Sequence, residues 1–413
     1  MTRTPIRSAP GALTALLLLA GCSELFHNKR ADEAHQRWSH MRASVKLQLA
    51  QKSYDNGAID DALKQCNEVL RLDPEFTDGY LLATRIHLER GEVSKARSAL
   101  DAAAARPPMT PETTYLQGVI AERQGRREEA LIHYQDAYLA DPDEVDYLLT
   151  YVESLIAADL CEQALEIIEP RRADFEQTPA VHTLAGQALS LLGRDTEAAE
   201  CYQFAVHLAP DNPLLHEEAG IAFLAAGWNA AAVDTLMPLT RTKTDASTEE
   251  RTDPHPPTSA GAIRAVTTAL LRNGQPARAA RVLEQAIKEH ASEPTLWLML
   301  ADAHLRSGDL HSAANAARQT VTLAPEEPEA LLVLAYADLQ THRDQEAIAT
   351  ARRILDRHPD DVEARALLAL ALERRPDGRV GAAEQYRRIL SITPTHRWSR
   401  ARLQRLDQQA RAD

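Results

Sequence analysis

The chain has 413 residues, of which 44% are hydrophobic and 26% are charged, and its formal net charge is -14. This acidity makes nucleic acid a poor partner, and an aromatic content of 5% suits helices rich in alanine and leucine better than a β-sandwich core. The charge is uneven, because residues 111–240 hold 23 acidic and 6 basic residues, whereas residues 363–413 hold 11 basic and 6 acidic ones.

The N-terminus has the pattern of a secretory signal. Arg3 and Arg7 precede an apolar run over residues 12–20, which is too short to span a bilayer. The run ends in Leu-Ala-Gly-Cys at 19–22, which resembles the box at which bacterial lipoprotein precursors are acylated on cysteine and cut before it. An ordinary cleaved signal with an incidental Cys22, or a chance apolar start on a cytosolic repeat protein, are the alternatives.

The lipoprotein resemblance implies a signal peptide over residues 1–21 and a lipid-anchored protein of the bacterial cell envelope, with the membrane reached through Cys22. By the enterobacterial sorting rule, Ser23 after the cysteine implies the outer membrane, facing the periplasm. Residues 22–42 are expected to form the lipidated tether and the start of a capping helix. That helix carries Trp38, Met41 and Val45 on one side, and its first half is expected to cover the end of the array that follows.

From residue 43 onwards the chain repeats with a period of about 34. Ten alanines mark the period: Ala62, Ala96, Ala130, Ala164, Ala198, Ala232, Ala279, Ala313, Ala347 and Ala382. A fixed period of this kind indicates a repeat architecture. In the unit 179–212, two apolar runs of about thirteen residues flank Gly193, and each is too short to be a stable helix alone. We expect Gly193 to turn the chain, Asp195 to cap the second helix and Pro210 to end it.

With glycine recurring at repeat positions 8 and 15 and proline at position 32, the pattern resembles the tetratricopeptide repeat (TPR) over residues 43–395. The resemblance implies an all-α, right-handed α-solenoid of about ten helix hairpins with a C-terminal capping helix. Repeats 1–6 then occupy residues 43–240, repeats 7–10 occupy 260–395, and the cap occupies 396–413. Asp159 and His342 replace the turn glycine in two repeats, where the hairpins are expected to persist with slightly strained turns.

Two segments stand outside the repeats. Residues 241–259 are rich in Thr, Asp, Glu and Pro and are expected to form a flexible polar loop, either a hinge or a passive insertion. In the C-terminal helix we expect one apolar side to pack on repeat 10 and one basic side to face water. The apolar side is Trp398, Leu403 and Leu406, and the basic side is Arg397, Arg400, Arg402 and Arg405.

The sequence offers no catalytic or cofactor motif, so we expect no enzyme activity, no cofactor, no metal and no small-molecule substrate. Cys66, Cys161 and Cys201 lack metal spacing and are interpreted as packing residues. The family binds partners on the face lined by the first helix of each hairpin. The residues that this implies here are Arg85, Glu89, Tyr115, Glu122, Arg123, Glu153, Gln187 and Glu217.

These side chains suit a basic or amphipathic peptide or protein. The leading hypothesis is a scaffold that assembles or organises a pilus, secretion or polysaccharide-export machine. A peptide-binding, chaperone-like adaptor and a non-catalytic targeting subunit of an enzyme remain as alternatives.

Overall fold

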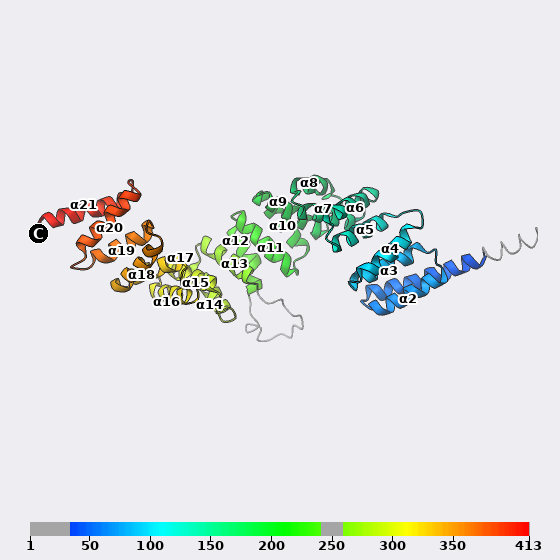
Figure 1. The fold of residues 1–413 in the computed structure, drawn as a ribbon, viewed down its shortest axis with the longest axis horizontal. Coiled ribbons are helices and arrows are strands. Elements are labelled where there is room, and N and C mark those ends of the chain that lie inside the picture. The colour runs from blue at the N-terminus through cyan, green and yellow to red at the C-terminus, as the bar shows by residue number, and fades with distance from the viewer. Residues whose placement is uncertain (1–33, 241–258, 413) are drawn as a thin grey trace, which may run out of the picture. The chain divides into compact units, whose positions relative to one another are not determined.

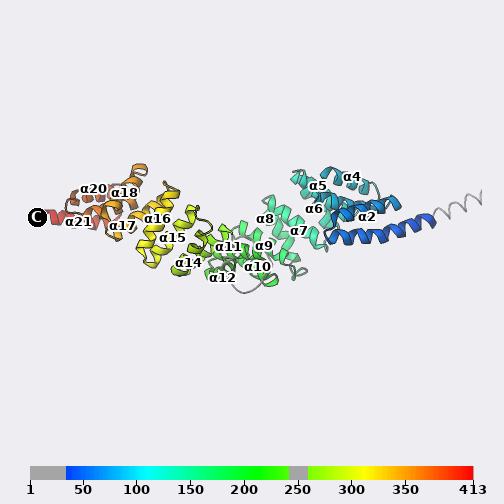
Figure 2. The same cartoon turned by 90° about the horizontal axis from the view of Figure 1, so that it is seen from below.

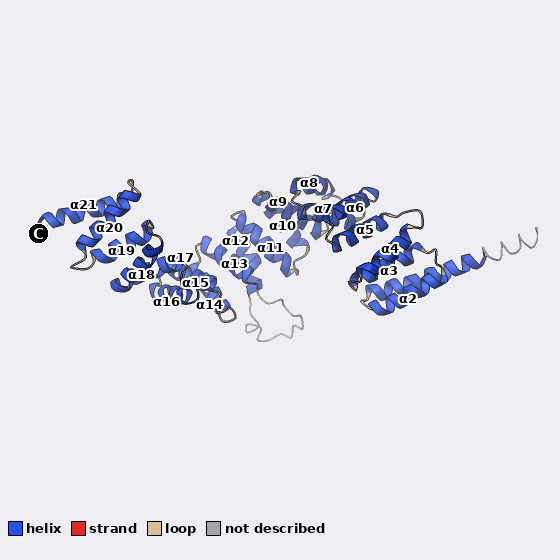
Figure 3. Ribbon diagram, viewed as in Figure 1, coloured by secondary structure: helices blue, strands red, loops and turns tan. Residues whose placement is uncertain are grey.

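The computed structural model describes residues 34–240 and 259–412, and within these residues the chain forms helices and turns without a β-strand (Figure 3). The prediction of an all-α fold is therefore confirmed. The predicted signal peptide, Cys22 and nearly all of the predicted loop at 241–259 lie outside the described residues. The contacts divide the chain into two units, and the boundary in the sequence falls between Phe175 and Glu176.

The first unit is built from consecutive helix hairpins (Figure 1). It begins with a helix over residues 34–55, here called the N-terminal helix. The following helices are α2 (Ile59–Leu72), α3 (Thr77–Glu89), α4 (Val93–Ala104), α5 (Pro111–Arg123), α6 (Arg127–Ala140), α7 (Val145–Ala157), α8 (Cys161–Ile168) and the short η1 (Glu169–Arg171). Each helix packs on the next one along the chain, and first helices of adjacent hairpins, such as α3 and α5, also touch.

The second unit continues the same arrangement, as two perpendicular views show (Figures 1 and 2). Its hairpins before the undescribed loop comprise α9 (Pro179–Leu191), α10 (Asp195–Leu208), α11 (Pro213–Ala225), α12 (Asn229–Leu236) and η2 (Met237–Thr240). After the loop come α13 (Ala260–Arg272), α14 (Pro276–Ile287), α15 (Pro294–Ser307), α16 (Leu310–Leu323), α17 (Pro328–Gln340), α18 (Asp344–Arg357), α19 (Val362–Glu373), α20 (Arg379–Ile392) and α21 (Arg397–Ala412).

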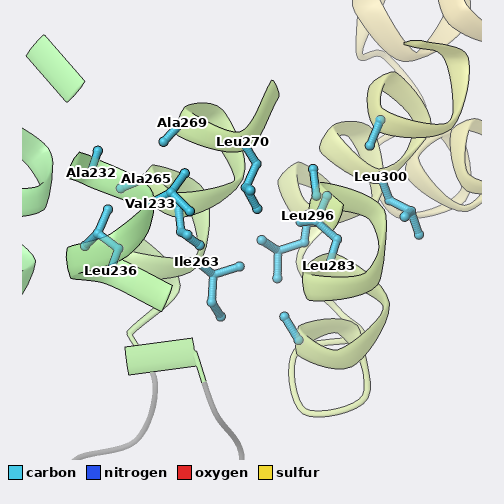
Figure 4. Packing of buried hydrophobic residues seen from close by; sticks show 14 of the residues in the cluster. Ala232, Val233, Leu236, Ile263, Ala265, Ala269, Leu270, Leu283, Leu296 and Leu300 are labelled. Atoms are coloured by element: carbon cyan, nitrogen blue, oxygen red, sulfur yellow. The ribbon is translucent and has the colours of Figure 1, made fainter. Parts of the chain in front are cut away.

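The core runs along each unit between the helices. In the second unit, Leu236 of α12, Ile263 of α13 and Leu283 of α14 come from two adjacent hairpins and belong to one apolar cluster (Figure 4). All ten marker alanines have an exposed fraction of 2% or less. They lie in the second helix of each hairpin, where a methyl group lets the two helices pack closely.

The positions of the other repeat markers also have a physical cause. A Cβ atom added at Gly118, Gly186 or Gly220 would come within 3.0 Å of the large side chain at repeat position 24, which is Tyr134, Tyr202 or Leu236. Glycine at position 8 therefore makes room for that side chain.

The turns between helices require a left-handed residue. Gly193 has φ = +71°, and both Asp159 and His342 have φ = +61° where they replace the turn glycine. The hairpins persist in both places, as expected. The prediction that Asp195 caps α10 is wrong, because the cap position is Arg194 and Asp195 is the first helical residue. In that place its carboxylate still suits the positive end of the helix dipole.

The hairpins are also joined by side chains that bind the backbone carbonyl at repeat position 32. In five cases the donor lies six residues further on, at the start of the next helix: His182 to Glu176, His216 to Pro210, Trp297 to Ala291, Arg365 to Pro359 and Arg400 to Pro394. Two other carbonyls, those of Pro142 and Pro325, accept from Arg171 and Arg353 of the following hairpin. These carbonyls lie in the connections beyond the last helical residue, outside any helical hydrogen-bond pattern, and these donors supply their partner.

The C-terminal helix α21 packs on the last hairpin as predicted, with Leu406 buried and Leu403 against the same cluster. One basic residue departs from the prediction. Instead of facing water, Arg402 places Nη1 3.0 Å from Glu373 Oε1 and stacks over the Trp398 ring at 5.4 Å. Arg400 also bonds to the chain, through the Pro394 carbonyl.

Candidate functional site

One group of aromatic and charged side chains in the first unit comes from the first helices of four successive hairpins. We call it the tyrosine–carboxylate face, and it comprises Tyr54, Arg85, Glu89, Glu112, Tyr115, Glu122, Tyr147 and Glu153. These residues are brought together because the first helices of consecutive hairpins lie next to one another. Residues about 34 positions apart in the sequence therefore lie side by side on one surface.

Arg85 is the cation at the centre of this face. Its Nη2 lies 2.7 Å from Glu112 Oε1, in an ion pair whose side chains are 41% and 28% exposed. Burial raises the pKa of Tyr54, and the neighbouring Glu89 raises it further, whereas Arg85 lowers the pKa of both Tyr54 and Tyr147. Arg85 thus stands among several acidic or phenolic groups, and the face is left with more negative than positive charge.

Three tyrosine rings pack together at this face, and Tyr147 among them lies close to Glu112. The ring centroid of Tyr115 lies 5.1 Å from that of Tyr147 and 5.8 Å from that of Tyr134, which are distances typical of packed aromatic pairs. Tyr134 is buried beneath, and its hydroxyl donates to Glu122 Oε2 at 2.7 Å. Tyr115 and Tyr147 are half-buried, so part of each ring remains available to a ligand.

Burial controls the titration of these groups. It is the largest cause that raises the pKa of Tyr147 to about 12, followed by the negative charge of Glu112. Burial also raises the pKa of Glu112 above its ordinary value of 4.5, although Arg85 pulls it down. Because burial disfavours the ionised form of Glu112, a second cation brought by a ligand would further stabilise that carboxylate.

The structure brings most of the sequence-predicted binding residues into this face. Arg85, Glu89, Tyr115, Glu122 and Glu153 belong to it. Arg123 is exposed at the end of α5, next to Glu122.

The remaining two predicted residues lie in the second unit. Gln187 is exposed on α9. Glu217 on α11 is half-buried and accepts a hydrogen bond from the Ser259 hydroxyl, which makes its carboxylate less available than the sequence suggested.

Sequence reasoning missed Tyr54, Glu112 and Tyr147. For two of them a signal was present, because Glu112 occupies repeat position 2 and Tyr54 occupies position 12, both of which line the family's binding face. Tyr147 occupies position 3, which is small or aliphatic in most repeats and buried there. A tyrosine is too large for that place, and the side chain stays half-buried.

The histidines with repeated positions have structural partners. Nδ1 of His87 lies 2.7 Å from Glu92 Oε2, and Nε2 of His304 lies 3.6 Å from Glu284 Oε1. Among residues 34–240 and 259–412, no group of three or more His, Cys, Asp or Glu side chains is arranged to hold a metal ion. Cys66 and Cys161 are buried free thiols, and Cys201 is also buried.

Helical hairpins stacked in this way, with an exposed face formed by their first helices, define an α-solenoid of the protein-interaction class. A family model described as Tetratricopeptide repeat matches residues 47–106, 81–145, 268–328, 298–361 and 332–396, which together make up more than half of the chain. The chain belongs to the tetratricopeptide repeat family, whose members typically serve as non-catalytic scaffolds for protein–protein interaction.

Among curated proteins, the chain is similar to the TPR repeat-containing protein YpiA of Bacillus subtilis (strain 168), with 23% identity over 164 residues. The match covers 40% of this chain and 39% of YpiA, so the chain spans about two fifths of the length of that relative.

No helix in the described part of the chain combines the length and the apolar character needed to cross a membrane.

Similar solved structures include PilW, described as a widely conserved type IV pilus biogenesis factor, with 18% identity, a TM-score of 0.45 and coverage of 50% of this chain and 94% of PilW. PilF of Pseudomonas aeruginosa has 15% identity and a TM-score of 0.40 and covers 62% and 94% of the two chains. YrrB, described as a TPR protein with an unusual peptide-binding site, has 16% identity, a TM-score of 0.34 and coverage of 41% and 88%.

Proposed function

We propose that the protein is an envelope scaffold that binds a cationic segment of a partner protein on the tyrosine–carboxylate face. The observation that carries the proposal is the cluster around Arg85, Glu112 and Tyr147, where carboxylates and partly exposed rings adjoin one another. Lysine or arginine side chains of a ligand pair with such carboxylates and lie over tyrosine rings. The segment 111–175 holds 15 acidic and 5 basic residues, and this surplus of 10 acidic residues adds long-range attraction.

The proposal is tested with a fluorescent decapeptide of alternating arginine and leucine, titrated against the purified chain. Replacing two carboxylates of the face, Glu89→Gln with Glu153→Gln, is expected to weaken binding. At about 0.2–1 kcal/mol per exposed charge, the affinity falls about two- to thirtyfold. The matched control is Glu128→Gln with Glu162→Gln, which removes the same charge from exposed positions on second helices of the same unit.

Equal losses in the two double variants would mean that the acidity acts only through net charge, and the proposed face would be wrong. The dependence of the binding rates on salt concentration is a second test of the proposed face. Steering by exposed charge is screened over about 8 Å at physiological ionic strength, so association should slow as salt rises while dissociation changes less. Binding that is indifferent to salt would also contradict the proposal.

The envelope location is the second part of the proposal, and it is supported by the sequence alone. The box at residues 19–22 and the basic and apolar segments before it favour lipid attachment at Cys22, and Ser23 favours the outer membrane facing the periplasm. A scaffold held there would serve the assembly or organisation of a pilus, secretion or polysaccharide-export machine.

Cell fractionation tests this location. The Cys22→Ser variant should move to the soluble fraction, or accumulate as an unprocessed precursor of higher mass. A variant that stays in the membrane fraction with the mass of the wild-type protein would rule out the lipid anchor, while leaving the peptide titration unaffected.

A further inference from the structure

The N-terminal helix has two apolar sides. On one side, Ala43 and Ala50 are fully buried, and Leu47 and Tyr54 pack in the cluster formed with α2 and α3. The opposite side carries four large apolar residues that are exposed by more than half: Trp38 57%, Met41 59%, Val45 56% and Leu49 54%. Their spacing of three, four and four residues aligns them in one row, which we call the N-terminal stripe.

The stripe is the end surface of the repeat array. Val45 and Leu49 occupy repeat positions 3 and 7. In repeat 5 these positions hold Val181 and Ala185, both of which are fully buried. The difference arises because no hairpin precedes the N-terminal helix among the described residues. The described part of that helix therefore leaves the stripe exposed.

The charged side chains that the helix itself carries over residues 34–54 are all basic. Residues 34–54 contain Arg37, Arg42, Lys46 and Lys52 and no acidic residue, within a chain of net charge -14. At 100° per residue, Arg37 and Arg42 flank the stripe on its two sides, and both are exposed.

The acidic groups near the stripe come from α2. Lys46 forms an ion pair with Glu68, and Asp61 lies near Leu49. Lys64 also lies near Leu49 and Asp61. Together with Arg37 and Arg42, these residues leave the end surface with a positive net charge.

This charge selects the occupant of the stripe. A second copy placed on it would bring Arg37 and Arg42 against the same two cations, which is unfavourable. The basic C-terminal helix of another copy would be repelled as well, since residues 396–413 contain five arginines and two aspartates. An anionic surface has the complementary sign.

We propose that the N-terminal stripe docks on the surface of a bilayer that contains anionic phospholipid. Helices with a basic polar border and a row of Trp and aliphatic residues lie in the membrane interface, with the apolar row about 5–10 Å into the boundary between headgroups and acyl chains. Trp38 suits that boundary, and Arg37 and Arg42 reach lipid phosphates. The docking requires no modification at Cys22, so it stands apart from the proposed lipid anchor.

The test measures insertion at single positions of the full-length chain in a Cys22→Ser background. A fluorophore that shifts to the blue in apolar surroundings is attached to Met41→Cys, on the stripe. The matched control is Gln36→Cys, which is exposed on the opposite side of the same helix and closer to the N-terminus. With vesicles of phosphatidylcholine and phosphatidylglycerol, the probe at 41 should shift while the probe at 36 should not, and vesicles of phosphatidylcholine alone should give a much smaller effect.

The cations provide an independent readout. Each basic residue near an anionic membrane contributes about fivefold in affinity, so Arg37→Gln with Arg42→Gln should raise the lipid concentration at half-maximal shift about 25-fold. The control pair Arg127→Gln with Arg264→Gln removes the same charge from exposed positions elsewhere and should leave that concentration unchanged.

Three results would overturn the proposal: equal shifts at 36 and 41, equal shifts with and without phosphatidylglycerol, or a shift at 41 that grows with protein concentration in the absence of vesicles. The last result would assign the stripe to contact between copies. Failure of lipid attachment is recognised separately by mass, because the Cys22→Ser protein then has the mass of the wild-type chain. Failure of the peptide-binding face is recognised by titration without vesicles.

Discussion

Replacing Gly220 with alanine should destabilise the second unit, although alanine is the better helix former. An ideal Cβ at Gly220 would lie 2.3 Å from Cγ, 2.5 Å from Cδ2 and 2.8 Å from Cδ1 of Leu236. Since ordinary contacts begin at 3.4 Å, Leu236 would have to move by about 1 Å, and it is fully buried. Overpacking costs about 1–3 kcal/mol, whereas the propensity of alanine returns about 1 kcal/mol. The free energy of unfolding should therefore fall by about 0–2 kcal/mol.

The assay is hydrogen exchange of α11 and α12, because repeat proteins unfold through nearest-neighbour contacts rather than as one globule. Gly381→Ala is the matched control, since its Cβ would meet only Leu372 Cδ1 at 3.4 Å and the helix should gain stability. In a double-mutant cycle, Leu236→Ala removes the side chain that the new Cβ would strike. The double variant should therefore lose less unfolding free energy than the sum of the two single losses, by at least about 0.5 kcal/mol. Additive losses, or a Gly220→Ala variant as stable as Gly381→Ala, would refute the steric reasoning.

Three further predictions concern other sites. Ala198→Leu should overpack the helix crossing in its repeat and lower the free energy of unfolding by about 1–3 kcal/mol in chemical denaturation, and a neutral effect would mean that the assigned repeat phase is wrong. Affinity for the arginine–leucine peptide should fall as the pH drops from 7 towards 5, because Glu112, whose pKa is raised, is protonated at a higher pH than an ordinary glutamate and then no longer attracts the peptide. Glu112→Gln should flatten this part of the pH profile. An unchanged pH profile in that variant would contradict the assignment. Burial raises the pKa of the Cys66 thiol to about 12, so mass spectrometry should find Cys66 unalkylated by iodoacetamide at pH 8 until the chain is unfolded, and rapid labelling of the native protein would count against the buried site.

The fold was predictable because the repeat period constrains it at many places at once. Each marker alanine, turn glycine and terminal proline restricts the same hairpin, so the substitutions at Asp159 and His342 did not disturb the pattern. The cap of α10 was assigned wrongly because an aspartate near a helix start serves either as cap or as first-turn residue. The sequence alone does not distinguish these two places, which differ by one residue.

The candidate site was predictable only in part. Repeat position indicates which side chains face outwards, and this placed Arg85, Tyr115 and Glu122 on one surface. It does not indicate which partners they find, and the pair of Arg85 with Glu112 joins two different repeats. The same limitation hid the exposed N-terminal stripe, because Val45 and Leu49 look like core residues until the absence of a preceding described hairpin is known.

The bonds to the position-32 carbonyls suggest that the modules of this chain are interchangeable. The donor is histidine, tryptophan or arginine, yet it always lies six residues beyond its acceptor in the five direct cases. Excision of residues 179–212 would join Thr178 to Pro213 and bring His216 into the place of His182, within reach of the Glu176 carbonyl. The shortened array would thus form the same histidine–carbonyl bond at its new junction. An array of this kind can therefore gain or lose a repeat without needing a new type of contact between repeats.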